Sequence, residues 1–393
     1  MSYNFDKPVN RSNTHSIKWD KLHKTFGLDD VLPMWVADMD FTCPKAILDS
    51  IEKRNKHGIF GYTSQPESLH ESIIGWMKKK HGWDIKKEWL VYSPGVVTSL
   101  NLATISFTQP GDSVVIQVPV YPPFFSAIKG HDRVVAPNSL LENQGYYSID
   151  FDDLEEKMAS GSKMMILCSP HNPVGRVWTK DELEKIANLC EKYDVLMVSD
   201  DIHSDLILPG HDHIPIATVS KYMKENSITC IAPSKTFNIP GLMASVAIIP
   251  NPRLRRQFEK TISRIGIGMI NVFGMVAMEA AYSHGEPWLD ALISYLDDNL
   301  SYCMEYFKSY IPEIKVRKPQ GTYLVWLDCR SLNMEGKALH KFMTAQGKIG
   351  LNNGMDFGPG GQGFLRINIA CPRSTLKEGL HRIKRAVDIW RKL

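Results

Sequence analysis

The chain has 393 residues, of which 43% are hydrophobic and 23% charged, so it is long enough for two or three domains and has the composition of a folded globular protein. Its 46 basic and 43 acidic side chains give a formal net charge of +3, which creates no overall field favouring nucleic acid or an anionic membrane. We therefore expect a small-molecule ligand.

The seven cysteines are widely separated, so they predict neither a disulfide framework nor a paired-cysteine metal site. The first twenty residues lack the apolar core of a signal peptide. No segment has the roughly 18 consecutive apolar residues that a membrane span needs. We expect a cytoplasmic protein.

Two helices are predicted near the N-terminus, over 44–58 and 66–82, because each begins at a proline and ends at a glycine. A third helix follows Gly95. Its first free N–H groups, those of Val96, Val97 and Thr98, form a potential anion site that the helix dipole strengthens. Such sites are common, so this one alone does not identify a phosphate ligand.

Five apolar runs bounded by turn residues are predicted to be buried strands: 113–119, 163–169, 195–200, 228–233 and 244–250. Helical segments separate them, and one begins with a capping box formed by Thr179 and Glu182. This alternation predicts an α/β fold with a mostly parallel central sheet flanked by helices.

After residue 286 the pattern changes to a long helix near 287–310, short strands and a terminal helix. This arrangement is typical of a smaller α+β domain. We predict an N-terminal segment, 1–48, that joins the small domain, a large domain over 49–286 and a small domain over 287–393.

Polar or aromatic residues stand at or just beyond the ends of four predicted strands, in chain order Tyr121, Asn172, Asp200 and Lys235. Ligands of α/β sheets bind beyond the carboxyl ends of the strands. A lysine buried there loses its proton more easily and can form a Schiff base. Each residue also has an ordinary explanation, such as a surface lysine, an Asx turn, a turn cap or a packing ring, but the coincidence of the three polar residues favours a site.

Arg366 lies inside the apolar run 364–370, where an unpaired guanidinium would be costly. Either a buried salt bridge or a substrate carboxylate would satisfy it. The preceding run 358–363 matches the dinucleotide motif G-x-G-x-x-G, but it leads into a strand rather than a helix, so we reject that interpretation.

A metal site is an alternative for the segment that follows 195–200. It offers carboxylate and imidazole ligands within fourteen residues, at Asp200, Asp201, His203, Asp205, His211 and His213. We do not favour it, because the last two histidines lie at a Pro-Gly turn that is more typical of solvated loops.

Taken in order, the motifs S-P-H-N-P-V-G at Asn172, S-D-D-I-H at Asp200, S-K-T-F-N-I-P-G-L at Lys235 and F-L-R-I-N-I-A at Arg366 resemble the aspartate aminotransferase superfamily of fold-type I pyridoxal-phosphate enzymes. The resemblance covers nearly the whole chain. Four further segments, 33–44, 59–69, 199–206 and 319–328, resemble its cystathionine β-lyase branch, the MalY or PatB type.

The resemblance implies that Lys235 carries the cofactor linkage and acts as the catalytic base. It implies that Asp200 pairs with the pyridine nitrogen, and that Tyr121 stacks on the ring and shares in catalysis. Asn172 is then expected to bind the ring hydroxyl oxygen, with His203 beside it.

For the phosphate, the resemblance implies contacts from Val96, Val97 and Ser234, together with Tyr62 of a neighbouring subunit in a homodimer. Many members carry an arginine eight residues after the lysine, where this chain has Met243. Substrate contacts are expected from Arg366, which would bind the α-carboxylate, and from Asp38 and Tyr121.

The implied activity is a carbon–sulfur β-lyase that cleaves L-cystathionine or related cysteine S-conjugates to a thiol such as homocysteine, pyruvate and ammonia. An aminotransferase uses the same residues and is the main alternative. A metal-dependent hydrolase and a catalytically silent binding protein are more remote ones.

Overall fold

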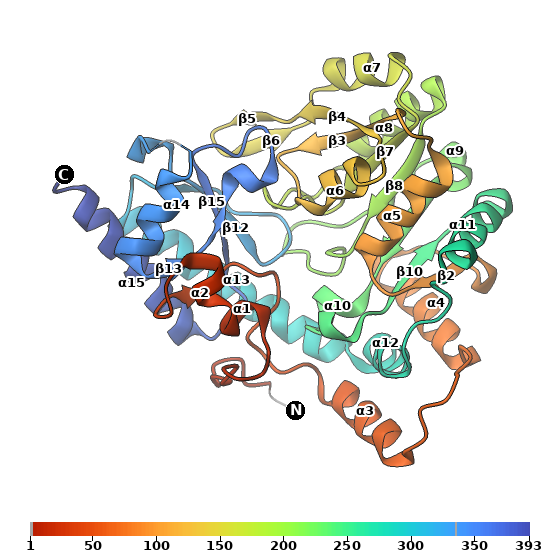
Figure 1. Cartoon of the computed structure of the whole chain (residues 1–393), viewed down its shortest axis with the longest axis horizontal. Coiled ribbons are helices and arrows are strands. Elements are labelled where there is room, and N and C mark those ends of the chain that lie inside the picture. Colours follow the sequence, from red (N-terminus) through yellow and green to blue (C-terminus); the bar gives the residue numbers. More distant parts are fainter. Residues whose placement is uncertain (1–2, 335) are drawn as a thin grey trace.

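The computed structural model describes residues 3–334 and 336–393. A seven-stranded sheet lies at its centre (Figure 1), with the strand order β2-β10-β9-β8-β7-β3-β4. Its strands are β2 (Leu90–Ser93), β3 (Ser113–Val118), β4 (Val134–Ser139), β7 (Met164–Cys168), β8 (Leu196–Asp200), β9 (Ser227–Ile231) and β10 (Ser245–Ile248). The pairs from β9 to β4 are parallel, whereas β10 is antiparallel to both of its neighbours. The predicted mostly parallel sheet is confirmed, and the run 244–250 is its antiparallel member.

Both faces of the sheet are covered, as the continuous apolar strands predict. On β3, Val114 and Ile116 pack with α5 (Val96–Phe107), α6 (Pro123–Lys129) and α11 (Pro252–Ile265). Val115, between them, packs on the other face with α7 (Phe151–Ala159) and α8 (Lys180–Tyr193). Adjacent residues thus face opposite helical layers, because side chains alternate along a strand.

The helix ends follow the sequence signals. The two N-terminal helices are α3 (Lys45–His57) and α4 (Glu67–His81), and each follows a proline at the N-cap. Each ends at a glycine with a positive φ angle, 76° at Gly58 and 62° at Gly82, a conformation that glycine adopts without steric cost. The capping box at the start of α8 is also present.

A second, four-stranded sheet has the order β11-β12-β15-β14. Its strands are β11 (Lys315–Val316), β12 (Leu324–Asp328), β14 (Asn352–Asn353) and β15 (Phe364–Asn368). The nearby helices are α13 (Glu286–Tyr310), α14 (Ala338–Phe342) and α15 (Arg373–Trp390). The predicted long helix, short strands and terminal helix therefore lie close to their expected positions.

The N-terminal segment lies beside this C-terminal part of the chain, where Figure 1 shows red next to blue. It contains α1 (Ile17–Asp20), α2 (Leu22–Phe26) and β1 (Leu32–Pro33). The strand β1 pairs in parallel with β13 (Ile349–Gly350). The N-terminal segment is thus hydrogen-bonded to the C-terminal part of the chain.

Several elements were not predicted from sequence patterns. Among them are the strands β2 and β4, the hairpin β5 (Leu141–Asn143) and β6 (Tyr146–Ser148), and the helices α9 (Lys221–Glu225), α10 (Pro233–Thr236) and α12 (Val272–His284). Most residues of α12 are buried, so this helix has no polar face to reveal its period. In the described part of the chain, no helix is both long and apolar enough to cross a membrane.

Candidate active site

A cavity of about 280 Å³ lies beyond the carboxyl ends of the central strands. The predicted site residues that line it are Val96, Val97, Tyr121, Asn172, Asp200, His203, Ser234 and Lys235. Arg366 reaches this group through a hydrogen bond to Asn172, whereas neither Asp38 nor Tyr62 lines the cavity. The parallel strands thus bring together residues that are far apart in the sequence.

Lys235 enters the cavity from α10, the single helical turn that follows β9. Its Nζ donates a hydrogen bond to the carbonyl oxygen of Ala37 over 2.6 Å. Burial lowers the pKa of Lys235 to about 8, although the nearby Asp38 carboxylate acts in the opposite direction. A substantial fraction of this amine is therefore neutral near physiological pH, and a neutral amine can act as a nucleophile or a base.

Asp200 is the last residue of β8 and is buried. Burial raises the pKa of its carboxyl group to about 7, despite a hydrogen bond of 3.2 Å from the Ile202 N–H to Oδ1. Lys235 favours the charged form, but it is not within ion-pair distance. A cation placed in the cavity would convert this carboxyl group into a stable carboxylate.

Arg366, on β15, is 3% exposed and has neutral hydrogen-bond partners. Its Nη1 donates to Oδ1 of Asn172 over 2.8 Å, and its Nη2 donates to the Trp35 carbonyl oxygen over 3.1 Å. Its Nε has no partner among the described residues. No acidic side chain in the described ranges forms an ion pair with Arg366, so the buried salt-bridge explanation is wrong.

Burial lowers the pKa of Arg366 to about 10, while the neighbouring Tyr121 and Tyr323 act in the opposite direction. The guanidinium is still charged at neutral pH. A buried guanidinium without a negative partner has a strong free-energy preference for an anion. A substrate carboxylate is the ligand that its planar fork fits best.

His203 and Tyr121 are kept neutral by their surroundings. Burial, with Lys235 and Arg366 nearby, lowers the pKa of His203 to about 3. Its Nδ1 is buried and has no hydrogen-bond partner in the structure described here. Burial also raises the pKa of the half-buried Tyr121 above its usual value. Both rings can therefore hydrogen-bond or stack on a ligand without adding charge.

The N-terminus of α5 opens into the same cavity. Gly95, at the N-cap, supplies no side-chain cap, and the first bond of the helix runs from the Ser99 N–H to the Gly95 carbonyl oxygen. The N–H groups of Val96, Val97 and Thr98 are consequently available to a ligand. Thr98, whose N–H group the sequence already indicated, also lines the cavity, and its hydroxyl group is a further candidate donor to an anion.

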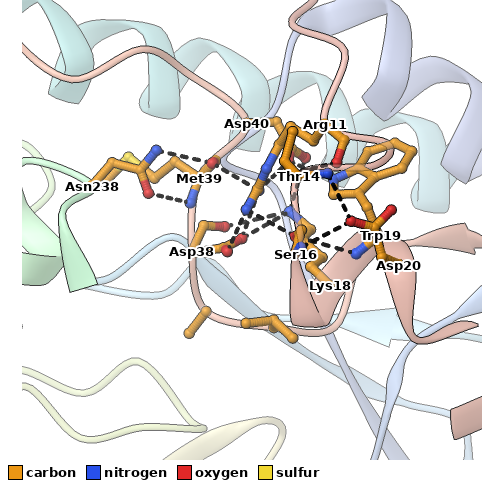
Figure 2. A network of polar contacts seen from close by, with 12 residues as sticks. Arg11, Thr14, Ser16, Lys18, Trp19, Asp20, Asp38, Met39, Asp40 and Asn238 are labelled. Atoms are coloured by element: carbon orange, nitrogen blue, oxygen red, sulfur yellow. Dashed lines mark hydrogen bonds and ion pairs between the residues drawn. The ribbon is translucent and has the colours of Figure 1, made fainter. Parts of the chain in front are cut away.

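Asp38 is held outside the cavity by two basic residues of the N-terminal segment (Figure 2). Its carboxylate accepts hydrogen bonds from Nη1 and Nη2 of Arg11, over 2.9 and 2.7 Å. Lys18, which is 1% exposed, lies 3.6 Å from Asp38 and 2.8 Å from Asp40. Arg11 also pairs with Asp40 over 2.7 Å. These four residues, the N-terminal charge cluster, balance two positive with two negative charges.

The charge cluster fixes the loop that carries Ala37, the acceptor of Lys235. From the opposite side, Asn238 accepts the Met39 N–H over 2.8 Å and donates to the Met39 carbonyl oxygen over 2.9 Å (Figure 2). Asn368 donates to the carbonyl oxygens of Val36 and Asp38 over 2.7 and 2.6 Å. The loop therefore joins the lysine turn, β15 and the N-terminal segment.

Three residues of the metal alternative, Asp201, Asp205 and His213, lie in two buried pairs, whereas Asp200 and His203 line the cavity and His211 is exposed. Nε2 of His213 lies 2.9 Å from Asp201, and Nε2 of His81 lies 2.9 Å from Asp205. Asp205 also accepts the hydroxyl group of Thr236, the residue after Lys235, over 2.8 Å. Within residues 3–334 and 336–393, no group of three or more such side chains is arranged to hold a metal ion.

Tyr62 lies in the segment between α3 and α4 and is 96% exposed. Met243, in contrast, lines the cavity and is 51% exposed. No arginine lines the cavity in the described part of the chain, and Lys235 is its one lysine. A phosphate bound there would thus depend mainly on backbone N–H groups and hydroxyl groups of this subunit.

Comparisons with known proteins agree with this geometry. The model of the aminotransferase class I and II family matches residues 30–383. The chain is 47% identical to cystathionine β-lyase PatB of Bacillus subtilis, with 98% of this chain and 100% of that protein covered.

Two solved structures are also similar. Cystalysin from Treponema denticola, whose crystal structure contains a pyridoxal 5'-phosphate cofactor, is 40% identical with a TM-score of 0.96, covering 99% of this chain and 100% of that one. The pyridoxal-phosphate-bound C–S lyase from Staphylococcus hominis is 34% identical with a TM-score of 0.92, covering 98% of each chain.

The charge cluster predicts a large effect of Lys18→Met on stability. The substitution leaves two carboxylates facing the single charge of Arg11, and the loss of one partner from a buried ion pair costs about 3 to 5 kcal/mol. Urea unfolding measures this change. Lys45→Met, which removes a highly exposed ion pair with Asp49, is the control and should leave the unfolding midpoint unchanged. Equal effects of the two substitutions would contradict this account of the cluster.

Proposed function

Because the chain belongs to the aminotransferase class I and II family, we propose that it is a pyridoxal-phosphate-dependent carbon–sulfur β-lyase. It cleaves L-cystathionine or related L-cysteine S-conjugates to a thiol, pyruvate and ammonia. The observation that carries this proposal is one cavity that Lys235 and Asp200 line and Arg366 adjoins, all three without neutralising partners, in a chain 47% identical to a cystathionine β-lyase. The branch that the sequence motifs resemble is confirmed by the same similarity.

The residues of the cavity fit pyridoxal phosphate. The free N–H groups at the start of α5, with the nearby Thr98 and Ser234, match the phosphate. The buried carboxyl group of Asp200 matches a protonated pyridine nitrogen, and the Lys235 amine matches the aldehyde carbon. The phosphate, the ring nitrogen and the aldehyde carbon of the cofactor thus each have a counterpart among these groups.

When bound, pyridoxal phosphate supplies an electron sink for the electron pair left on the substrate Cα after a proton is removed. Lys235 is the base that takes this proton, and a pKa of about 8 keeps part of it deprotonated. Arg366 binds the α-carboxylate and thereby orients the Cα–H bond. A thiolate on Cβ can then leave, which gives elimination.

The other side chains hold the ligand in place. We assign Tyr121 to stacking on the ring and Asn172 to the ring hydroxyl oxygen, because both line the cavity. His203, neutral and with an unpartnered Nδ1, lies in the same cavity and adds no competing charge. Asp38 acts on Lys235 through its charge, since its carboxylate is bound by Arg11.

Elimination and transamination use the same residues, so product analysis separates them. With the purified holoenzyme, pyruvate release from L-cystathionine should be faster than keto-acid formation from aspartate, alanine or aromatic amino acids. Lys235→Ala should reduce pyruvate release by about a thousandfold or more, because it removes the base. Lys180→Ala, at an exposed lysine, is the matched control and should behave like the wild type.

Faster transamination, with negligible pyruvate from every cysteine conjugate, would contradict the lyase assignment. It would leave the cofactor assignment standing and favour an aminotransferase. Full activity of Lys235→Ala would contradict the cofactor assignment itself.

We further propose that the active unit is a homodimer in which Tyr62 completes the phosphate site of the partner subunit. Two observations support it. The cavity has no arginine among its described lining residues, and the segment 59–62 exposes three large apolar side chains, Ile59, Phe60 and Tyr62. A two-fold dimer would cover these side chains and supply the missing contact.

Mixed dimers test this arrangement. Lys235→Ala and Tyr62→Ala should each be severely impaired as pure dimers. Coexpressed together, they should recover activity up to about a quarter of the wild-type value, because half of the dimers are mixed and each mixed dimer has one intact site. Lys235→Ala with Asp200→Ala is the control and should recover nothing, since both residues belong to the same site. An active monomer in sedimentation, or no recovery with Tyr62→Ala, would refute site sharing.

A further inference from the structure

Arg366, which we propose binds the substrate carboxylate, contacts a residue that neither the sequence motifs nor the cavity lining identifies. Asn352 lies on β14, directly opposite Arg366 on β15. Its Oδ1 accepts a hydrogen bond from Nη2 of Arg366 over 2.6 Å. This is the shortest of the three hydrogen bonds that the guanidinium donates to described residues.

Every oxygen that Arg366 contacts is uncharged. These oxygens belong to the side chains of Asn172 and Asn352 and to the Trp35 carbonyl group. Amide oxygens fix the plane of the guanidinium but do not cancel its charge. The ring of Phe357, 4.9 Å from the guanidinium carbon, adds a weakly attractive face and also brings no negative charge.

A carboxylate at position 352 would behave differently. Aspartate has nearly the same shape as asparagine, so its oxygen would reach the same nitrogen and form a buried ion pair. That ion pair would satisfy Arg366 within the protein and compete with the α-carboxylate of an amino acid. The amide at this position therefore determines whether Arg366 is available to a ligand.

We propose that Asn352 is a positioning residue that orients Arg366 while keeping its charge uncompensated, so that the site selects ligands with an α-carboxylate. This inference rests on the proposed function, because it takes an amino acid as the substrate. Asn353, the next residue, provides a matched control. Its Oδ1 accepts the Met355 N–H and makes no contact with Arg366.

The test compares two ligands of the holoenzyme that lack a leaving group, L-alanine and ethylamine, which differ by the α-carboxylate. Calorimetry gives the dissociation constant of each. Asn352→Asp should weaken L-alanine binding by about ten- to hundredfold, the range for a hydrogen bond between charged groups, and change ethylamine binding less than twofold. Asn353→Asp adds the same charge one residue away and should change neither.

A third variant separates charge from geometry. Asn352→Ser removes the bond to Arg366 without adding charge, so it should weaken L-alanine binding less than Asn352→Asp. The thermal unfolding midpoint of Asn352→Asp should equal or exceed that of the wild type, because the new carboxylate compensates a buried cation. A residue with a merely structural role would not give this combination of weaker binding and retained stability.

Equal loss of L-alanine and ethylamine binding in Asn352→Asp would overturn the inference, as would a larger loss in Asn352→Ser. Failure of the proposed function would look different. L-alanine binding by the wild type and the position-352 variants would differ as expected, and yet the wild-type holoenzyme would release no pyruvate from cysteine conjugates.

Discussion

The structure depends on charged groups that are brought together in or beside one cavity without being neutralised. Lys235, Asp200 and Arg366 come from different elements. Burial lowers the pKa of Lys235 and Arg366 and raises that of Asp200, so it favours the neutral form of each group. Such an arrangement lowers the stability of the empty protein, because buried charges without partners are costly. A cofactor with an aldehyde, a ring nitrogen and a phosphate, together with a substrate α-carboxylate, would supply a partner for each of these groups. The chemistry of the site therefore follows from its electrostatics.

Beside the cavity, in contrast, the buried charges are neutralised by ion pairs. In the N-terminal charge cluster, Arg11 and Lys18 are fully matched by Asp38 and Asp40 at distances of 2.7 to 3.6 Å. The matched charges hold the loop whose Ala37 carbonyl oxygen accepts from Lys235. Rigid, neutral surroundings thus support reactive, uncompensated groups, as preorganised active sites require.

Local sequence patterns predicted most of the sheet and the residues at its edge, because apolar runs and the polar residues after them are encoded within short segments. They did not predict that β10 is antiparallel, since strand direction depends on the connection. The partners Ala37 and Asn352 could not be predicted either. Lys235 meets Ala37 across 198 residues, and a backbone carbonyl group leaves no side-chain signature in the sequence. The choice between a salt bridge and a ligand for Arg366 likewise required its neighbours in space.

The most direct test of the uncompensated site is the stability of the cofactor-free protein between about pH 4 and pH 9, measured by urea unfolding for the wild type and Asp200→Asn. The pKa of Asp200 is about 7 in the folded protein, above its ordinary value of 3.8, so the native state binds an extra proton between these two pH values. The wild type should therefore lose stability relative to Asp200→Asn as the pH rises from about 4 to about 7, and the difference should stay constant above that. A difference that does not vary with pH, or one that shifts in favour of the wild type as the pH rises from about 4 to about 7, would contradict the account.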